Sequence, residues 1–98
     1  MNNQIIDTIR KYFETRPVDK VWIFGSFSRG EELPDSDVDI MFSLTSGAKF
    51  SLLDHATWIY ELEDLLSRKV DLVKDGTLLP FAVESANHDK ILVYERAA

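Results

Sequence analysis

The chain has 98 residues, of which 45% are hydrophobic, so it can form one compact domain with a single core. This length leaves no room for the separate fingers and thumb subdomains of a processive polymerase. The formal net charge of −6 and the pI of about 4.7 argue against direct binding of nucleic acid, because such binding normally uses a basic patch.

The first predicted element is an amphipathic helix over residues 3–15, which Pro17 would end. Its apolar residues recur at helical spacing: Ile5, Ile6, Ile9 and Phe13. We expect this helix to pack against a sheet.

A buried strand is predicted over residues 21–24, and it stops at Gly25, where the absence of a side chain lets the backbone approach a ligand closely. A helical turn is predicted from Ser26 to Arg29, closed by Gly30. Ser26 would offer backbone N–H groups and a hydroxyl to an anion such as phosphate. Arg29 is a candidate partner for the remaining phosphate charge. The alternative is an ordinary turn with a surface arginine.

A second strand is predicted over residues 37–42, in which Asp37 and Asp39 share one face while Val38 and Ile40 share the other. Aspartate is disfavoured in strands, and two neighbouring aspartates repel each other unless a cation lies between them. Mg²⁺ typically takes one or two carboxylates and completes its octahedron with water and substrate phosphates. The pair therefore indicates a metal site. A charged edge strand that discourages aggregation is the alternative.

A second helix is predicted after a loop at residues 45–47, because Ser51 and Asp54 have the spacing of a capping box. The stripe expected to face the core consists of Leu52, Ala56, Ile59, Leu62 and Leu66. Trp58 and Tyr60 lie off this stripe, so they are either covered by neighbouring elements or available to a partner.

A short strand is predicted over residues 69–73, with Asp71 on the face opposite Val70 and Leu72. If it lies beside the strand at 37–42, three carboxylates converge; otherwise Asp71 is a lone acid on a strand edge. Three aspartates around two Mg²⁺ ions suit phosphoryl or nucleotidyl transfer, because the metals position the attacking oxygen and stabilise the transition state. Asp71 would then act as, or orient, the base.

The C-terminal part is predicted to contain a turn at residues 75–76, a third helix capped by Thr77 and a last strand over 91–94. That strand is too uniformly apolar to be expected in an exposed position. The only histidines, His55 and His88, are expected at the surface, as neither ligands nor bases.

These motifs together resemble the minimal nucleotidyltransferase (MNT) family of the DNA polymerase β superfamily. They are Gly25-Ser26, then ten residues that include Arg29-Gly30, then Asp37-x-Asp39, and after a helix Val70-Asp71-Leu72-Val73. The resemblance covers nearly the whole chain. It implies an α+β domain over residues 1–98 with the polymerase β-like nucleotidyltransferase fold: a mixed sheet of three or four strands with helices packed mainly on one face.

By this resemblance, Gly25 and Ser26 hold the nucleotide triphosphate and Arg29 lies close to its phosphates. The residues that would bind metal and carry catalysis are Asp37, Asp39 and Asp71. Such small proteins are usually encoded beside a helical HEPN-domain partner, and some are MntA-like antitoxins that transfer AMP from ATP to a tyrosine of that partner. The expected function is therefore AMP transfer from ATP with two Mg²⁺ ions, in a homo- or hetero-oligomer.

Two other functions stay open. A non-catalytic antitoxin would neutralise its partner by binding, and a small-molecule adenylyltransferase would normally need a second domain to form the acceptor pocket. A calcium-binding EF-hand loop is excluded because Ile40 and Ser46 replace the required Gly and Glu, and the Gly-Lys-Ser/Thr ending of a Walker phosphate loop is absent. With no cysteine, signal peptide or apolar run of membrane-spanning length, the default expectation is a cytoplasmic protein.

Overall fold

The computed structural model describes residues 3–25, 37–75 and 90–97. In these residues the helices are α1 (Asn3–Glu14) and α3 (Leu52–Leu66), and the strands are β1 (Val18–Phe24), β2 (Val38–Leu44), β3 (Val70–Lys74) and β4 (Ile91–Glu95). The strands form a four-stranded sheet in the order β3-β2-β1-β4. β2 and β3 are parallel, whereas β1 is antiparallel to β2 and β4. The predicted α+β fold with a mixed sheet is confirmed.

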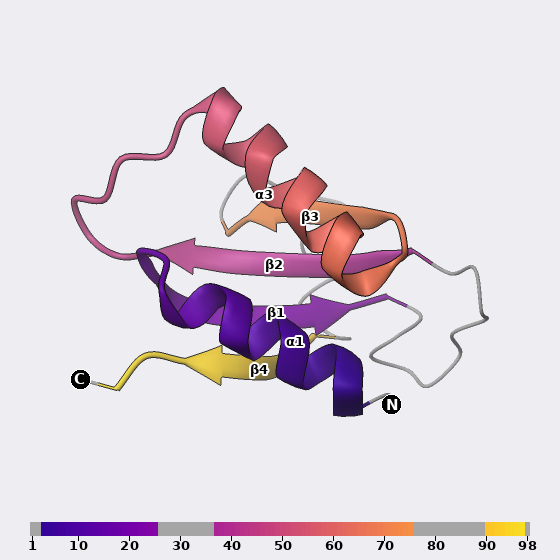
Figure 1. Ribbon diagram of the computed structural model, residues 1–98. Helices are drawn as coiled ribbons and strands as arrows, with labels where there is room; N and C mark the ends of the chain where they lie inside the picture. Colours follow the sequence, from indigo (N-terminus) through magenta and orange to yellow (C-terminus); the bar gives the residue numbers. More distant parts are fainter. Residues whose placement is uncertain (1–2, 26–36, 76–89, 98) are drawn as a thin grey trace.

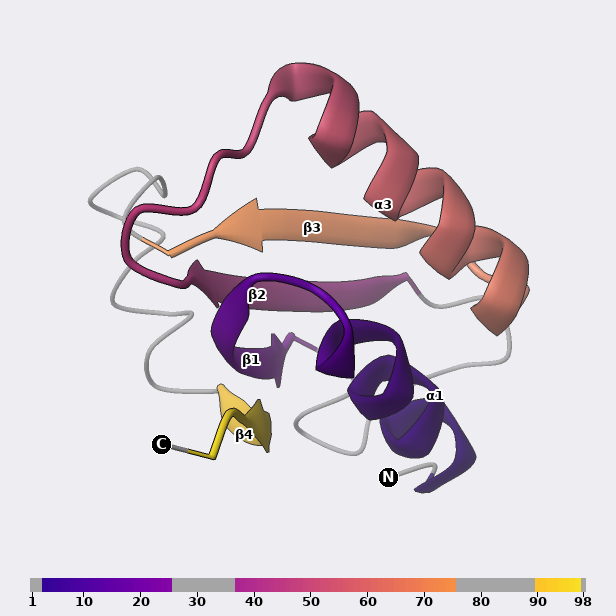
Figure 2. The same ribbon diagram turned by 60° about the vertical axis from the view of Figure 1, so that its left-hand side comes forward.

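Both helices lie on one face of this sheet, as Figures 1 and 2 show. α1 packs near β1 and β4, and α3 runs beside β3. The predicted third helix from Thr77 lies outside the described residues. Neither α1 nor α3 is long and apolar enough to cross a membrane.

The core fills the space between the helices and the sheet. Alternate residues of β1 and β2 face the helices and are completely buried: Val21, Ile23, Val38, Ile40 and Phe42. From α1, Ile9 and Phe13 are also completely buried. Phe13 meets Trp58 of α3 edge to face, with ring centroids 5.9 Å apart. One continuous core thus joins both helices to the sheet.

α3 begins at the predicted capping box. The Ser51 hydroxyl accepts a hydrogen bond from the Asp54 backbone N–H (3.1 Å), and the Ser51 N–H donates to Asp54 Oδ2 (2.9 Å). These two bonds satisfy N–H groups that a helix start leaves without intrahelical partners.

The side of α3 that faces the sheet differs from the predicted stripe. Two residues of that stripe are buried as expected, Leu62 and Leu66. Leu52, however, is 89% exposed, and Ala56 is exposed as well. Trp58 is buried instead and packs against the rings of Phe42 and Phe50, at centroid distances of 5.4 and 4.7 Å. The indole buries more apolar area than leucine or alanine, so its packing decides the rotation of the helix.

A buried tyrosine links α1 to α3. The Tyr12 hydroxyl donates to Glu61 Oε1 (2.6 Å), and the Arg16 guanidinium lies over the Tyr12 ring and 3.3 Å from the same Glu61 oxygen. Burial, followed by the bond to Glu61, raises the pKa of Tyr12 above its ordinary value. The same hydrogen bond is the main cause that lowers the pKa of Glu61.

The expectation that the last strand does not stay exposed is wrong for two of its residues. Val93 is buried, but Ile91 is 38% and Leu92 45% exposed. The reason is the position of β4 at the edge of the described sheet, where its only neighbouring strand is β1. An edge strand beside a single helix has less cover than a central strand.

Candidate active site

Two of the predicted catalytic aspartates lie side by side on neighbouring strands. β2 and β3 are parallel, and their register pairs Asp39 with Asp71. Neighbouring strands lie about 4.8 Å apart, so the two side chains leave the backbone close together. The condition on which the role of Asp71 depended, that its strand lies beside the strand of Asp39, is therefore met.

Asp39 and Asp71 point to the face of the sheet opposite the helices. The residues that flank them in sequence are buried in the core: Val38, Ile40, Val70 and Leu72. Because successive residues of a strand point to opposite faces, the two carboxylates emerge on the other side. Asp39 is half-buried and Asp71 is exposed, so a ligand can reach both from that face.

Asp37, the third predicted carboxylate, lies immediately before β2 and is exposed. Within residues 3–25, 37–75 and 90–97, no group of three or more His, Asp or Glu side chains is arranged so that it could hold a metal ion. Asp39 and Asp71 thus lie together as a pair. The role of Asp37 as a third ligand stays a prediction.

Gly25 follows β1 and lies against the carboxylate of Asp39. The preceding residue, Phe24, is the partner of Asp39 in the β1–β2 register. Gly25 has a φ of +72°, and a Cβ built at this position would overlap Asp39 Oδ2. Only glycine combines this backbone conformation with such a close approach. The absence of a side chain at Gly25 therefore makes room for the site carboxylate itself.

Gly25, Asp39 and Asp71 gather at one end of the sheet, because β1 ends where β2 and β3 begin (Figure 1). The other two predicted nucleotide-binding residues, Ser26 and Arg29, lie outside the described residues, as does the turn that Gly30 would close.

Two side chains of α3 bind the backbone of β3 on either side of Asp71. Glu63 Oε2 accepts a hydrogen bond from the Val70 N–H (3.0 Å), and His55 Nε2 lies 2.7 Å from the Leu72 carbonyl oxygen. The expectation that His55 is merely a surface residue is wrong, since it is half-buried and hydrogen-bonded. Sequence reasoning missed both residues, because no local pattern links a helix side chain to the backbone of a later strand.

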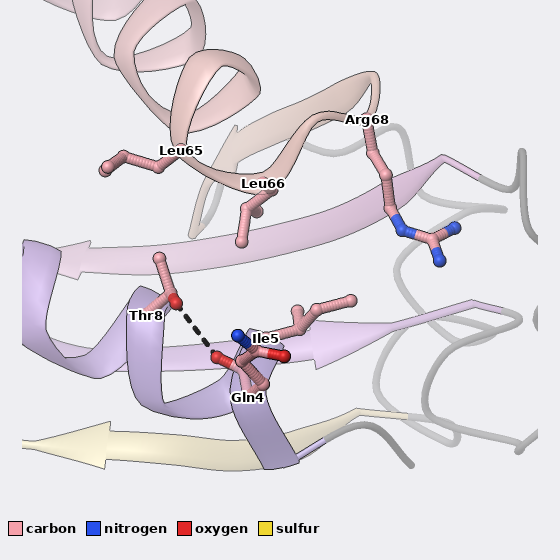
Figure 3. Close-up of a pocket in the computed structure, with 6 residues that line it drawn as sticks. All are labelled: Gln4, Ile5, Thr8, Leu65, Leu66 and Arg68. Carbon is pink, nitrogen blue, oxygen red and sulfur yellow. Dashed lines mark hydrogen bonds between the residues drawn. The ribbon is translucent and has the colours of Figure 1, made fainter.

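A pocket of about 240 Å³ lies between the helices, on the face opposite the carboxylates. Figure 3 shows its lining residues, which come from α1, the end of α3 and the segment after it: Gln4, Ile5, Thr8, Leu65, Leu66 and Arg68. None of them is an acid. This lining therefore offers none of the carboxylate oxygens that Mg²⁺ prefers.

Comparison with known proteins identifies the family. Residues 6–97 match the family described as nucleotidyltransferase domain. A relative from Methanocaldococcus jannaschii, named "Putative protein adenylyltransferase MJ1379", is 35% identical over 77 residues, which cover 78% of this chain and 77% of that protein.

The fold is also shared with solved structures. A chain from the crystal structure of a toxin–antitoxin with AMP-PNP aligns with a TM-score of 0.79 and 18% identity, over 93% of this chain and 73% of that one. A chain from the complex of tri-AMPylated Shewanella oneidensis HEPN toxin with MNT antitoxin aligns with a TM-score of 0.74 and 16% identity, over 98% and 74%. At these identities the likeness shows the fold alone. The family match over residues 6–97 shows more: this chain belongs to the nucleotidyltransferase domain family, as its motifs implied, and is a nucleotidyltransferase.

Proposed function

We propose that the chain is a protein adenylyltransferase that moves AMP from ATP to a tyrosine hydroxyl of a HEPN-type partner and thereby acts as its antitoxin. The observation that carries this proposal is the in-register pair of Asp39 and Asp71, with Gly25 against Asp39. The names of similar proteins support it, since they include protein adenylyltransferases and complexes with AMP-PNP or with an AMPylated HEPN toxin.

Asp39 and Asp71, with Asp37 as a third carboxylate, would hold Mg²⁺, and two ions are proposed. Carboxylate oxygens are the side-chain ligands that Mg²⁺ prefers, and the ion leaves its other positions to water and substrate phosphates. Two carboxylates on neighbouring strands, reachable from one face, fit this preference. When bound, the ions neutralise phosphate charge and make the attacking oxygen more reactive.

Other residues of the chain are proposed to bind the phosphates and to accept the proton. The backbone at Gly25 and the hydroxyl of Ser26 are proposed to hold the β- and γ-phosphates, with Arg29 close to the phosphate charge. Asp71 accepts the proton of the acceptor hydroxyl or orients the group that does. The acceptor oxygen then forms a bond to the α-phosphorus, while the bond from that phosphorus to the oxygen bridging to the β-phosphate breaks and pyrophosphate leaves.

The acceptor is proposed to come from a separate protein. Asp71 is exposed on the face that α1 and α3 leave uncovered, so the acceptor has to approach from outside the described part of the chain. The reaction is proposed to take place in the cytoplasm, where ATP and Mg²⁺ are both available. The protein is proposed to act without direct contact with nucleic acid.

The test is to incubate the protein with ATP, Mg²⁺ and a HEPN-domain protein from the same organism, and to measure AMP on the tyrosines of that protein by mass spectrometry. We expect wild type to modify the partner, and Asp39→Asn and Asp71→Asn to do so at least about 100-fold more slowly. Asp75→Asn is the matched control, because Asp75 is an exposed acid at the far end of β3.

Failure to modify the partner, or equal rates for wild type and Asp39→Asn, would contradict this function. If Asp39→Asn still neutralises the partner, the protein is instead an antitoxin that acts by binding.

A further inference from the structure

β3, the strand that carries Asp71, lies at an edge of the described sheet and pairs there with β2 alone. The Lys69 carbonyl accepts from the Val38 N–H (2.9 Å), and the Asp75 N–H donates to the Phe42 carbonyl (2.8 Å). Since backbone groups of successive residues point to alternate sides of a strand, the odd-numbered residues of β3 face β2. The even-numbered residues direct their N–H and C=O groups away from the sheet.

One outward group of Val70 and one of Leu72, the residues on either side of Asp71, meet α3. The Val70 N–H donates to Glu63 Oε2 at 3.0 Å, and the Leu72 carbonyl oxygen lies 2.7 Å from His55 Nε2. A carbonyl oxygen can only accept, so the Nε2 atom carries the hydrogen and donates it. Asp71 is thus bracketed by one bond on the residue before it and one on the residue after it.

The His55 ring is itself held in place. It is half-buried, and it meets the Phe50 ring edge to face, with centroids 5.9 Å apart. Phe50 packs in turn on Trp58, which is buried in the core (4.7 Å between centroids). The imidazole therefore connects the edge of β3 to the aromatic part of the core.

We propose that His55 and Glu63 are positioning residues that fix Asp71 opposite Asp39. β2 holds β3 from one side through the sheet, and α3 holds it from the other through these two bonds. Without the second contact an edge strand is free to shift against its single neighbour, and the separation of the two carboxylates changes with it. This inference rests on the proposed role of Asp71 in catalysis.

His55→Leu removes the donor but keeps an apolar side chain against Phe50. We expect kcat for AMP transfer to fall about tenfold with little change in KM for ATP, because misplaced catalytic groups reduce the chemical step more than binding. His55→Gln, whose amide can donate to the same carbonyl, should restore most of the rate. Glu63→Leu and Glu63→Gln form a second pair with the same expected order, since glutamine keeps an acceptor for the Val70 N–H.

Glu61→Leu is the matched control on the same helix. Glu61 bonds Tyr12 of α1 and not β3, so its loss weakens the fold without loosening Asp71. We expect this variant to have a lower melting temperature and an unchanged kcat at a temperature where it is folded.

Hydrogen exchange of the β3 amides, measured without nucleotide or metal, gives a readout independent of catalysis. In His55→Leu and Glu63→Leu these amides should exchange about tenfold faster than in wild type, while those of β1 keep their rates. Unchanged β3 exchange, or a loss of kcat no larger than in Glu61→Leu, would overturn the inference. If wild type itself transfers no AMP, the proposed function fails, and the β3 exchange rates alone decide whether α3 fixes this strand.

Discussion

At the scale of single residues, the site depends on how closely Asp39 is enclosed. Gly25 lies against its carboxylate from β1, and Asp71 stands beside it on β3. The carboxylates could be predicted because two-residue alternation, with apolar neighbours on both sides, fixes the face on which each aspartate lies. The bonds of His55 and Glu63 to β3 could not, because they depend on where the folded chain places α3.

Gly25→Ala should impair both folding and transfer. A positive φ costs an L-residue about 1–2 kcal/mol, and at Gly25 the new methyl group also overlaps the Asp39 carboxylate. Gly47→Ala is the control, because Gly47 has a φ of +81° but no atom near an added Cβ. Urea unfolding should show a loss of about 1–2 kcal/mol for Gly47→Ala and a larger one for Gly25→Ala.

Rates of AMP transfer separate the two glycine variants further. Gly25→Ala should lose most of its activity because the added methyl group displaces Asp39, whereas Gly47→Ala keeps the wild-type rate under conditions where it is folded. Equal activity of the two variants would show that the contact between Gly25 and Asp39 has no part in the site.

At the scale of elements, the start of a helix could be predicted from neighbouring residues, but the side of the helix that faces the core could not. The capping box of Ser51 and Asp54 involves only neighbouring residues, so the start of α3 could be predicted. The rotation of α3 depends on how Trp58 packs against Phe42, a residue of another element, and helical periodicity alone favoured a different stripe. The exposure of Leu92 could not be predicted from the local sequence either, because it follows from the position of β4 at the edge of the described sheet.

The link between α1 and α3 should make stability depend on pH. The lowered pKa of Glu61 means that its bond with Tyr12 stabilises the fold above the ordinary carboxyl value of 4.5 and is lost as the pH falls through the lower, folded-state pKa. Tyr12→Phe removes this bond and should lower Tm by roughly 2–6 °C near neutral pH. The difference should shrink as the pH falls below 4.5.

Thermal unfolding of wild type and Tyr12→Phe from neutral to acidic pH measures this dependence. Tyr60→Phe serves as the control, because Tyr60 lies on α3, as Glu61 does, but is 73% exposed, and it should leave Tm unchanged. A Tm difference that stays constant down to the acid unfolding of the protein would rule out the Tyr12–Glu61 bond as its source.

At the scale of the whole molecule, α1 and α3 cover one face of the sheet and the carboxylates occupy the other. The helix in residues 3–15 and the strand in residues 37–42 could be predicted from helical spacing and from alternation, and the core confirms both. The α+β fold with a mixed sheet was implied by the family resemblance. A single domain over residues 1–98, the oligomeric state and the partner stay predictions. The acceptor in particular has to be identified by its chemistry, because the predicted roles of the motif residues concern the donor and the metals alone.

Transfer of AMP, as opposed to a phosphoryl group, is tested most directly with ATP labelled either at the α- or at the γ-phosphate. Each is incubated with the protein, Mg²⁺ and a HEPN-domain protein as the proposed partner, and the label on the partner and in the released products is measured. The α-label should appear on the partner and the γ-label in pyrophosphate, with one pyrophosphate released for each AMP bound. A partner that carries the γ-label, or that carries neither, would contradict nucleotidyl transfer to this acceptor.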